Sequence, residues 1–295
     1  MSTNTTDPRV ALHSTGENRL RSTRFHTDLT KSNAPRSDRV STLWIEGELR
    51  HVDHVCLKSM QRAGMDVTLF HYGPISNVPP GIRTADGREI LNLSLIERLQ
   101  PIKRINRSSP VAMFSDFFRI FMLKQDRGMW LDSDVFVLRH FDYDTTKPYF
   151  AYEGGGRIGG PVFYVPPQHP IIGEYEELIQ QPDLWPNWLG VWRGFVRPTW
   201  WRLTGQEFST QDLGMTIYCN DGLSRLAKRY KCYRDALPKR TFYHWTGRET
   251  DKLFQPRKFD FLLKNPEHLG IHIHRKQGAL KPTCPGSFWE WALSQ

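Results

Sequence analysis

The sequence predicts an α/β fold in which a mixed, mostly parallel nucleotide-binding sheet is flanked by helices. Two patterns support this prediction. Residues 42–73 read as a strand, a helix and a second strand, which is the order of a right-handed βαβ unit. Further along, a helical run stops at Gly128 and is followed at once by residues 129–138, whose apolar and β-branched composition favours a strand.

Length and composition describe a globular protein. The chain has 295 residues, of which 39% are hydrophobic, so it can bury a substantial core as one large domain. Its formal net charge of +9 indicates attraction to polyanions. Nucleic acid, an anionic membrane surface and nucleoside diphosphates all satisfy that charge, and charge alone does not choose among them.

The first 39 residues differ from the rest of the chain. Residues 1–39 are polar, rich in Ser, Thr, Asn and Arg, and lack hydrophobic periodicity. Such a segment cannot bury enough apolar surface to offset the entropy of ordering, so we expect a disordered tail. The folded domain is expected to span residues 40–295.

Cysteine usage and hydropathy predict where the protein resides. The four cysteines show no C-x-x-C spacing and no clustering with histidine, which favours reduced thiols over zinc ligands or a disulfide framework. No apolar run approaches the roughly 20 residues that a membrane span needs. We therefore expect a cytoplasmic protein, with peripheral contact to the inner face of a membrane as a further expectation.

The βαβ unit opens the expected domain. Residues 42–49 read as its first strand, residues 52–64 as a helix ending at Gly64, and residues 65–73 as its second strand. Residues 74–106 read as a connector that contains one short apolar stretch of helix or strand. No chemistry is evident in this connector.

The central helix carries the first pair of candidate residues. Ser109 is a suitable N-cap, Pro110 suits the first helical position, and Gly128 suits a left-handed end. Asp116 and Arg119 are three residues apart, so a helix places an acceptor and a forked donor on one face.

The strand that follows carries two carboxylates. In an extended chain, Trp130, Asp132 and Asp134 point to the same side. Such a hard-oxygen cluster suits Mn²⁺ or Mg²⁺, held by one or two carboxylates and by a substrate phosphate. A second D-x-D tripeptide, Asp142 to Asp144, lies among loop formers, and we expect it to be a solvated turn.

Together these residues resemble a known family. The matching positions are Ser115, Asp116, Arg119, Leu123, Gly128, Trp130, Asp132 and Asp134. Their order and spacing are similar to the DXD sugar-binding region of retaining glycosyltransferases of the GT-A fold, a group that includes α-1,6-mannosyltransferases, α-1,4-galactosyltransferases and clostridial glucosylating toxins. Two positions depart from the pattern: Arg127 replaces a glycine and Trp130 replaces a tyrosine. Neither change removes a metal ligand.

The resemblance implies a GT-A-like domain and roles around a metal ion. Asp134 would bind the ion, and Asp132 would be shared between the ion and the donor's ribose or sugar. A late histidine completes the metal shell in several such enzymes, and both His272 and His274 match that arrangement. Which of the two binds is left open. The two lie on one side of a short extended segment and are followed by basic residues.

The resemblance also implies donor-binding and reacting positions. Asp116, Arg119 and Trp130 would orient the donor sugar. Trp44 would lie near the nucleotide base, with burial in the core as its alternative. Asp212 corresponds loosely to residues near the anomeric carbon, and it suits a helix N-cap equally well. In addition, Ser287 and Trp289 match the residues near the diphosphate.

Two further segments have more than one interpretation. The glycines beside Glu153 let the backbone approach a ligand closely, although they also suit a flexible turn. Residues 182–202 hold five tryptophans and three arginines. This composition suits a membrane interface or a sugar-stacking surface as well as an ordinary buried loop.

The expected function is a metal-dependent transfer of a sugar from a UDP- or GDP-sugar, with retention of configuration, to a glycan, glycolipid or other acceptor. No nucleic acid partner is expected. Two alternatives remain: a metal-dependent nucleotidyl- or phosphotransferase on a similar scaffold, and a non-catalytic basic module that binds nucleic acid or membrane with steep salt dependence.

Overall fold

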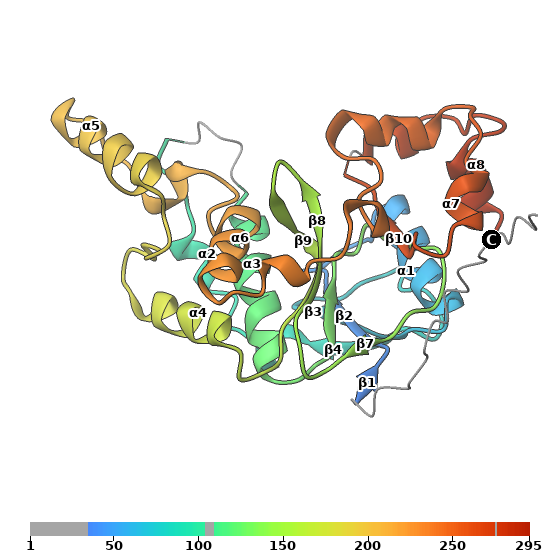
Figure 1. The fold of residues 1–295 in the computed structure, drawn as a ribbon, viewed down its shortest axis with the longest axis horizontal. Coiled ribbons are helices and arrows are strands. Elements are labelled where there is room, and N and C mark those ends of the chain that lie inside the picture. Colours follow the sequence, from blue (N-terminus) through green and yellow to red (C-terminus); the bar gives the residue numbers. More distant parts are fainter. Residues whose placement is uncertain (1–34, 104–108, 275) are drawn as a thin grey trace, which may run out of the picture. The chain divides into compact units, whose positions relative to one another are not determined.

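Six strands form the central sheet of the protein, in the order β4-β3-β2-β5-β9-β8 (Figure 1). The computed structural model describes residues 35–103, 109–274 and 276–295. Strands β2 to β5 run parallel, whereas β9 pairs antiparallel with β5 and β8. The bounds are β2 Arg39–Leu43, β3 Asp66–His71, β4 Arg83–Asp86, β5 Met129–Leu131, β8 Tyr149–Gly154 and β9 Arg157–Tyr164. The predicted α/β class with a mixed, mostly parallel sheet is confirmed.

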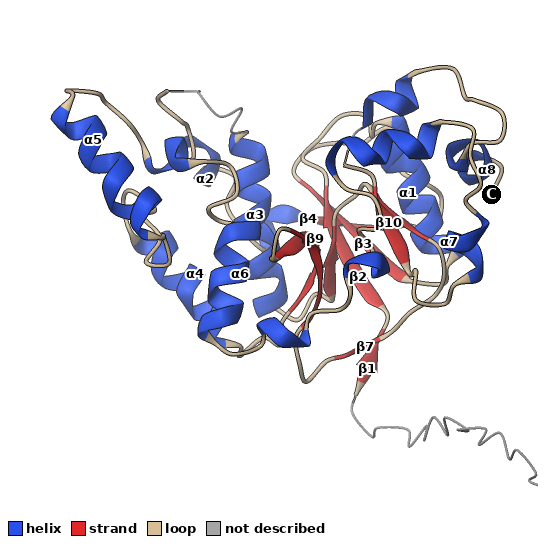
Figure 2. Cartoon of the chain, turned by 45° about the horizontal axis from the view of Figure 1, so that its top comes forward, coloured by secondary structure: helices blue, strands red, loops and turns tan. Residues whose placement is uncertain are grey.

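Helices cover both faces of this sheet. Figure 2 shows α3, α4 and α6 on one side, and α1, α7 and α8 on the other. The helices are α1 His51–Arg62, α2 Leu95–Arg98, α3 Pro110–Lys124, α4 Pro170–Gln180, α5 Arg197–Leu203, α6 Asn220–Arg229, α7 Asp260–Lys264 and α8 Phe288–Leu293. Two apolar cores result: one lies around the sheet, α3 and α4, and the other lies between α1, β6, β10 and α8.

Two small two-stranded sheets complete the fold. Strand β1, Arg36–Ser37, pairs with β7, Tyr143–Asp144, and β6, Val135–Val137, pairs with β10, Gly270–His272. Residues 1–34 of the expected tail lie outside the described residues. The last residues of that segment are in β1 and at the start of β2.

The βαβ unit is present, but its first strand begins earlier than expected. Strand β2 ends at Leu43, so Trp44 lies beyond it. The position of β2 is decided by its parallel pairing with both β3 and β5. The expected connector also contains a strand, β4, which has no apolar alternation and is held as an edge strand by its ladder with β3.

The central helix α3 begins as predicted and ends earlier. Ser109 Oγ accepts a hydrogen bond from Ala112 N at 3.3 Å, and Pro110 occupies the first turn. The helix closes at Asp126, whose φ is +51°. Asp126 N and Arg127 N donate to carbonyls of the preceding turn, as in a Schellman motif. Gly128, with φ +95°, is needed for a different reason: a Cβ there would lie 2.7 Å from Arg39 O.

The expected single strand over residues 129–138 is wrong. The chain turns between β5 and β6, because Val135 N donates to Asp132 O at 3.0 Å. The two halves belong to different sheets. The side chains of Asp132 and Asp134 therefore converge through a turn and not through the pleat of one strand.

The second D-x-D tripeptide is not a solvated turn. Tyr143 and Asp144 form strand β7 and are buried. Asp144 accepts hydrogen bonds from Thr146 N and Oγ1 at 2.9 and 2.6 Å, and Asp142 pairs with Arg36. These carboxylates stabilise the β1-β7 ribbon.

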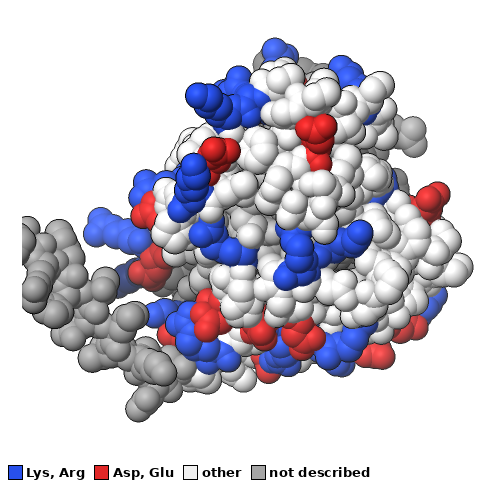
Figure 3. All heavy atoms as spheres, turned by 90° about the vertical axis from the view of Figure 1, so that its right-hand side faces the viewer, with Lys and Arg blue, Asp and Glu red and all other residues white. Residues whose placement is uncertain are grey.

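Two further properties are the distribution of surface charge and the length of the helices. On the face that carries α7 and α8, Lys and Arg side chains lie among Asp and Glu side chains (Figure 3). The positive net charge is thus not gathered into one continuous patch on that face. Among the described helices, none is long and apolar enough to cross a bilayer.

Candidate functional site

Helix α3 brings a buried charged pair to the carboxyl ends of the parallel strands. Asp116 and Arg119 are the charged residues on the buried surface of this otherwise apolar helix. Asp116 Oδ1 lies 3.1 Å from Arg119 Nη2. Burial raises the pKa of Asp116 to about 7, although the guanidinium opposes that rise. Charged groups are rarely buried unless they are paired, because burial of a charge costs free energy. The presence of this pair in an apolar helix therefore makes it a candidate for a functional role.

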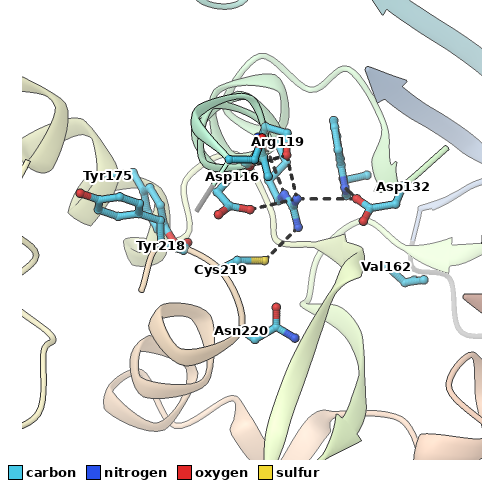
Figure 4. A network of polar contacts seen from close by, with 12 residues as sticks. Asp116, Arg119, Asp132, Val162, Tyr175, Tyr218, Cys219 and Asn220 are labelled. Atoms are coloured by element: carbon cyan, nitrogen blue, oxygen red, sulfur yellow. Dashed lines mark hydrogen bonds and ion pairs between the residues drawn. The ribbon is translucent and has the colours of Figure 1, made fainter. Parts of the chain in front are cut away.

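Arg119 is the centre of a polar network (Figure 4). Its Nη2 lies 3.6 Å from Asp132 Oδ1, and its Nη1 donates to Cys219 Sγ at 3.1 Å. The guanidinium also lies 4.9 Å from the centre of the Trp130 ring. Strand β9 runs close by, because a Cβ on Gly160 would lie 2.4 Å from Arg119 Nη1. These contacts hold the guanidinium in one orientation.

The turn after β5 orients the first carboxylate. Asp132 N donates to Pro161 O at 2.8 Å, which ties the turn to β9. Trp130 Nε1 donates to Asp132 Oδ1 at 2.5 Å. Trp130 and Asp132 therefore do share one side, as predicted. Because the Trp130 ring is buried, it presents an edge of its indole to the site and supports Asp132.

Asp134 is buried at the same turn, and one of its oxygen atoms is left without a hydrogen bond. Oδ1 has no hydrogen-bond partner among the described residues and lies 3.4 Å from His272 Nε2. Oδ2 forms an ion pair with Lys276. Burial opposes ionisation, but His272 and Lys276 hold the pKa of Asp134 well below its usual range. An ionised, buried and partly unsatisfied carboxylate is ready to accept a cation.

Strand β10 positions the histidines. Its register with β6 places His272 opposite Val135, and Ile273 N donates to Asp134 O at 2.9 Å. His272 is buried, and although burial opposes protonation, Asp134 raises its pKa. His274 follows with its ring centre 5.6 Å from that of His272. Burial lowers the pKa of His274.

These side chains can hold a metal ion. One ligand atom each from Asp132, Asp134 and His272 lie within 4.8 Å of one another, and a second such group joins His272 to Glu153 and His274. Carboxylate oxygen and imidazole nitrogen suit Mn²⁺ and related divalent ions. Asp134 Oδ1 has no hydrogen bond among the described residues, and the lowered pKa of this carboxyl fits the requirement that a metal ligand be deprotonated.

Two adjoining hollows meet at this cluster. The first, of about 430 Å³, is lined by Trp44, Ile45, Arg50 and neighbouring residues. The second, of about 340 Å³, is lined by Asp116, Glu153 and residues of the α6 region. They share Ala112, Ser115, Asp132, Asp134 and Lys276. The turn that carries Asp132 and Asp134 thus lies where the two hollows join. The first hollow has an aromatic wall and the second has a polar wall.

Several lining residues carry no sequence signal of their own. Cys219, Asn220 and Arg157 reach the second hollow, and Asn220 Nδ2 donates to Glu153. Tertiary packing alone brings them there. Lys276 is different, because it continues the spacing His272, His274, Lys276, and this alternation was a usable signal.

Trp44 was expected near the nucleotide base, and it lines the first hollow. Its ring lies 5.0 Å below the Arg50 guanidinium, and its Nε1 is buried with no hydrogen-bond partner among the described residues. Trp44 is partly buried and also packs against the first apolar core, so its contacts are compatible with both interpretations of this residue.

Three other expected site residues do not line either hollow. Asp212 is buried and closes a capping box with Ser209 at the short helix Thr210–Leu213. It also accepts from Lys103 N at 2.9 Å, so it braces two loops. Ser287 is the N-cap of α8, accepting from Glu290 N at 3.1 Å. Trp289 is buried in the second core, 5.9 Å from the His51 ring.

Comparisons with known proteins add little. No protein family model matches the chain, and no curated protein matches it. Among solved structures, the chain is similar to PaToxG glycosyltransferase, with a TM-score of 0.37 and 11% sequence identity. That similarity covers 70% of this chain and 88% of the other.

Proposed function

We propose that the protein is a metal-dependent glycosyltransferase that uses a nucleoside-diphosphate sugar. The observation that carries this proposal is the group of Asp132, Asp134 and His272, which lies where the two hollows meet. It includes a buried oxygen, Asp134 Oδ1, that has no hydrogen bond among the described residues. One hollow suits a nucleotide and the other suits a sugar with its acceptor. The cluster between them suits the diphosphate that joins the two parts of such a donor.

The metal would be held by Asp132, Asp134 and His272, and His274 with Glu153 offers an adjoining ligand group. When bound, Mn²⁺ or Mg²⁺ supplies Lewis-acid stabilisation of negative charge on the leaving diphosphate. The identity of the ion belongs to the proposal. Both ions accept carboxylate and phosphate oxygens, and Mn²⁺ also accepts imidazole readily.

The chain's own residues would bind and orient the donor. The Lys276 ammonium lines both hollows, so it can pair with a diphosphate oxygen in place of Asp134 Oδ2. Arg50 and Trp44 would hold the nucleotide, because the flat indole suits a base and the guanidinium suits its charge.

The polar network on α3 would hold the sugar. Asp116 and Arg119 line the second hollow, where a carboxyl and a fixed guanidinium can bind sugar hydroxyl groups. Negative charge grows on the diphosphate as the anomeric bond breaks, and positive charge grows on the sugar ring. We propose retention of configuration and name no enzymic base. A glycan or glycolipid is the proposed acceptor.

A donor screen tests this proposal. Purified protein with Mn²⁺ is offered each UDP- and GDP-sugar, and release of the free nucleoside diphosphate is followed. One donor should be turned over, with loss of turnover on adding a chelator and in Asp134→Asn. Asp142→Asn is the matched control, since it alters the other D-x-D tripeptide, and it should retain turnover.

Three results would contradict the proposal. Metal-dependent release of pyrophosphate would favour a nucleotidyltransferase, and release of inorganic phosphate would favour a phosphotransferase. Failure of every nucleotide sugar to bind by calorimetry in the presence of Mn²⁺ would favour a non-catalytic binding module.

A further inference from the structure

A row of apolar side chains projects into solvent from the helical arm that ends in α5. The arm consists of the π-helix Trp192–Val196 and α5, and Figure 1 shows it extending from the α2 and α4 side of the sheet. We call its exposed apolar row the stripe. The stripe comprises Trp192, Phe195, Val196, Trp200 and Leu203, of which Trp192, Phe195, Trp200 and Leu203 are 68%, 67%, 62% and 79% exposed. Isolated apolar side chains on a surface are ordinary, but a contiguous row of this kind marks an interaction site.

Helical spacing places the stripe on one face. Phe195 and Val196 lie three and four residues after Trp192, Trp200 lies four after Val196, and Leu203 lies three after Trp200. These spacings of three and four keep the members on the same side of a helix. The opposite side of the arm is held by the protein, because Pro198 and Trp201 are buried. The Trp201 ring lies 5.0 Å from the Phe208 ring. The arm is thus anchored by one face and cannot bury the stripe without giving up that contact.

Positive charge flanks the stripe. Arg193, Arg197 and Arg202 lie within the arm, and no acidic residue occurs between Asp183 and Glu207. Arg197 and Lys103 both lie over the Trp201 ring, at 4.4 and 5.2 Å. Arg202 is exposed and lies 5.6 Å from the centre of the Phe208 ring. The surface is therefore apolar along the stripe, with positive charge beside it from Arg197 and Arg202, whereas Arg193 is paired with Asp221.

We propose that this arm docks on an anionic lipid bilayer. Tryptophan, phenylalanine and leucine on one face with arginines beside them are the features of a helix that lies in a membrane interface. Indole rings are favoured at the headgroup level, and arginine stems lie along apolar surface while their charged ends reach lipid phosphates. Anionic headgroups complement the flanking arginines, and a chain with net charge +9 is drawn to such a surface.

A glycan-stacking role fits the same residues less well. Recognition of a sugar needs polar groups that converge on its hydroxyls in addition to an aromatic face. The stripe is a convex ridge that includes the aliphatic Val196 and Leu203, and its members carry no carboxylate or amide side chain. An interfacial contact needs only area and charge, which this surface has.

The arm is joined to the candidate site. Arg193 Nη1 forms an ion pair with Asp221 and lies 3.4 Å from Thr216 Oγ1. Thr216 lines the second hollow. Docking would therefore hold that hollow near the bilayer surface. If the proposed glycosyl transfer holds, a lipid-linked acceptor is then favoured over a free glycan, and this last step alone rests on the proposed function.

Vesicle binding tests the docking proposal without donor or metal. The full chain is sedimented with vesicles of phosphatidylcholine alone and of phosphatidylcholine mixed with phosphatidylglycerol. The wild type should bind the anionic vesicles, with a blue shift of tryptophan emission, and binding should weaken as salt rises. Trp192→Ser, Phe195→Ser and Trp200→Ser combined should reduce the bound fraction at least about tenfold. Arg202→Gln should weaken binding less and reduce its salt dependence.

A matched control uses apolar side chains exposed elsewhere. Leu280 and Leu293 are 80% and 38% exposed, and their combined change to Ser should leave vesicle binding intact. Far-ultraviolet circular dichroism checks that each variant is folded. Absence of wild-type binding, or equal binding by the triple variant, would overturn the proposal. So would concentration-dependent self-association that the triple variant removes, because the stripe would then be an interface between copies of the chain. Saturable binding of a soluble glycan that the triple variant loses, without vesicle binding, would also overturn it.

Discussion

Asp134 in the cleft and Glu174 on α4 are both buried acids, but their oxygen atoms are used differently. Glu174 Oε1 accepts from Arg229 Nη1 and the Tyr230 hydroxyl at 2.6 and 2.5 Å, and Oε2 accepts from Asn187 Nδ2 at 2.7 Å. Asp134 Oδ1 has no such partner in the described part of the chain. Burial of a carboxylate therefore does not mark a functional site by itself. Asp134 differs in lying beside His272 and Lys276 where two hollows meet, and the lack of a hydrogen bond to its Oδ1 adds to that evidence.

The sharpest test of this comparison is Asp134→Asn. It should reduce donor turnover about a hundredfold or more, because it weakens the proposed metal site and the charge stabilisation that depends on it. The free energy of unfolding should also fall at neutral pH, because His272 and Lys276 lose the buried carboxylate with which they pair. Kinetics and urea unfolding measure the two effects. A variant that loses stability while keeping turnover would reverse the roles assigned to the two acids.

Glu174→Gln should reduce stability without reducing turnover. The Arg229 guanidinium and the Tyr230 hydroxyl then lose the charged acceptor of their hydrogen bonds. The free energy of unfolding should therefore fall by about 1–3 kcal/mol at neutral pH. Turnover by the folded protein should be unchanged. Unfolding in urea and the donor assay provide the two measurements. Lost turnover at intact stability would show that Glu174 serves the site.

The effect of Glu174→Gln should also depend on pH. Burial opposes ionisation of Glu174, but hydrogen bonds from Tyr230, Asn187 and Arg229 lower its pKa below the usual value. Its stabilising contribution is therefore present above the unfolded-state pKa of about 4.3. The contribution is lost as pH falls through the lowered folded-state pKa. The stability difference between wild type and variant should shrink on acidification, and a difference that grows would exclude this assignment.

His272→Ala should weaken Mn²⁺ binding by about tenfold or more, because an imidazole ligand is removed from the group within 4.8 Å. Calorimetry with Mn²⁺ alone measures this effect. His268→Ala is a useful control, since His268 is buried with its Nδ1 2.7 Å from Arg240 O and belongs to neither metal group among the described residues. Equal losses in both variants would indicate a structural effect and not a lost ligand.

The smallest expected effects concern two tryptophans, Trp44 in the first hollow and Trp289 in the second core. Trp44→Phe should raise the donor KM about two- to fivefold without changing kcat, because the larger aromatic face beside Arg50 is lost. Trp289→Phe should alter stability and leave the donor KM unchanged, because Trp289 packs in the second core. Steady-state kinetics on both variants decide the matter. A raised KM in Trp289→Phe would restore the original expectation that it lies near the diphosphate.

Local sequence predicted the features that local physics controls. The N-cap at Ser109, the helix carrying Asp116 and Arg119, and the αβ alternation all follow from capping, periodicity and strand propensity. The grouping of Asp132, Asp134 and His272 was also expected, although the expected geometry of residues 129–138 was wrong. The turn at Asp132 could not be read from these residues, because an apolar β-branched run suits one strand or two.

Some residue types suit two roles, and the sequence does not choose between them. Asp212 and Ser287 were proposed at the site by resemblance, yet both stabilise local backbone, which Asp and Ser do in many loops and caps. Cys219 and Asn220 were not expected at all. They reach the second hollow because α6 packs on β9, a contact between segments far apart in the sequence.

By itself, the sequence determined the α/β class, the paired acids and the late histidines, since each depends on residue type and short spacing. The tertiary structure alone decided which of these groups meet. The pairing of β10 with β6 places His272 beside Asp134, and the approach of Gly160 leaves space for Arg119 but for no side chain of its own. The same packing gives both oxygens of Glu174 hydrogen bonds and leaves Asp134 Oδ1 with none from the described residues. The physical reason is that the hydrogen bonding of a buried polar atom depends on groups brought together from distant parts of the chain.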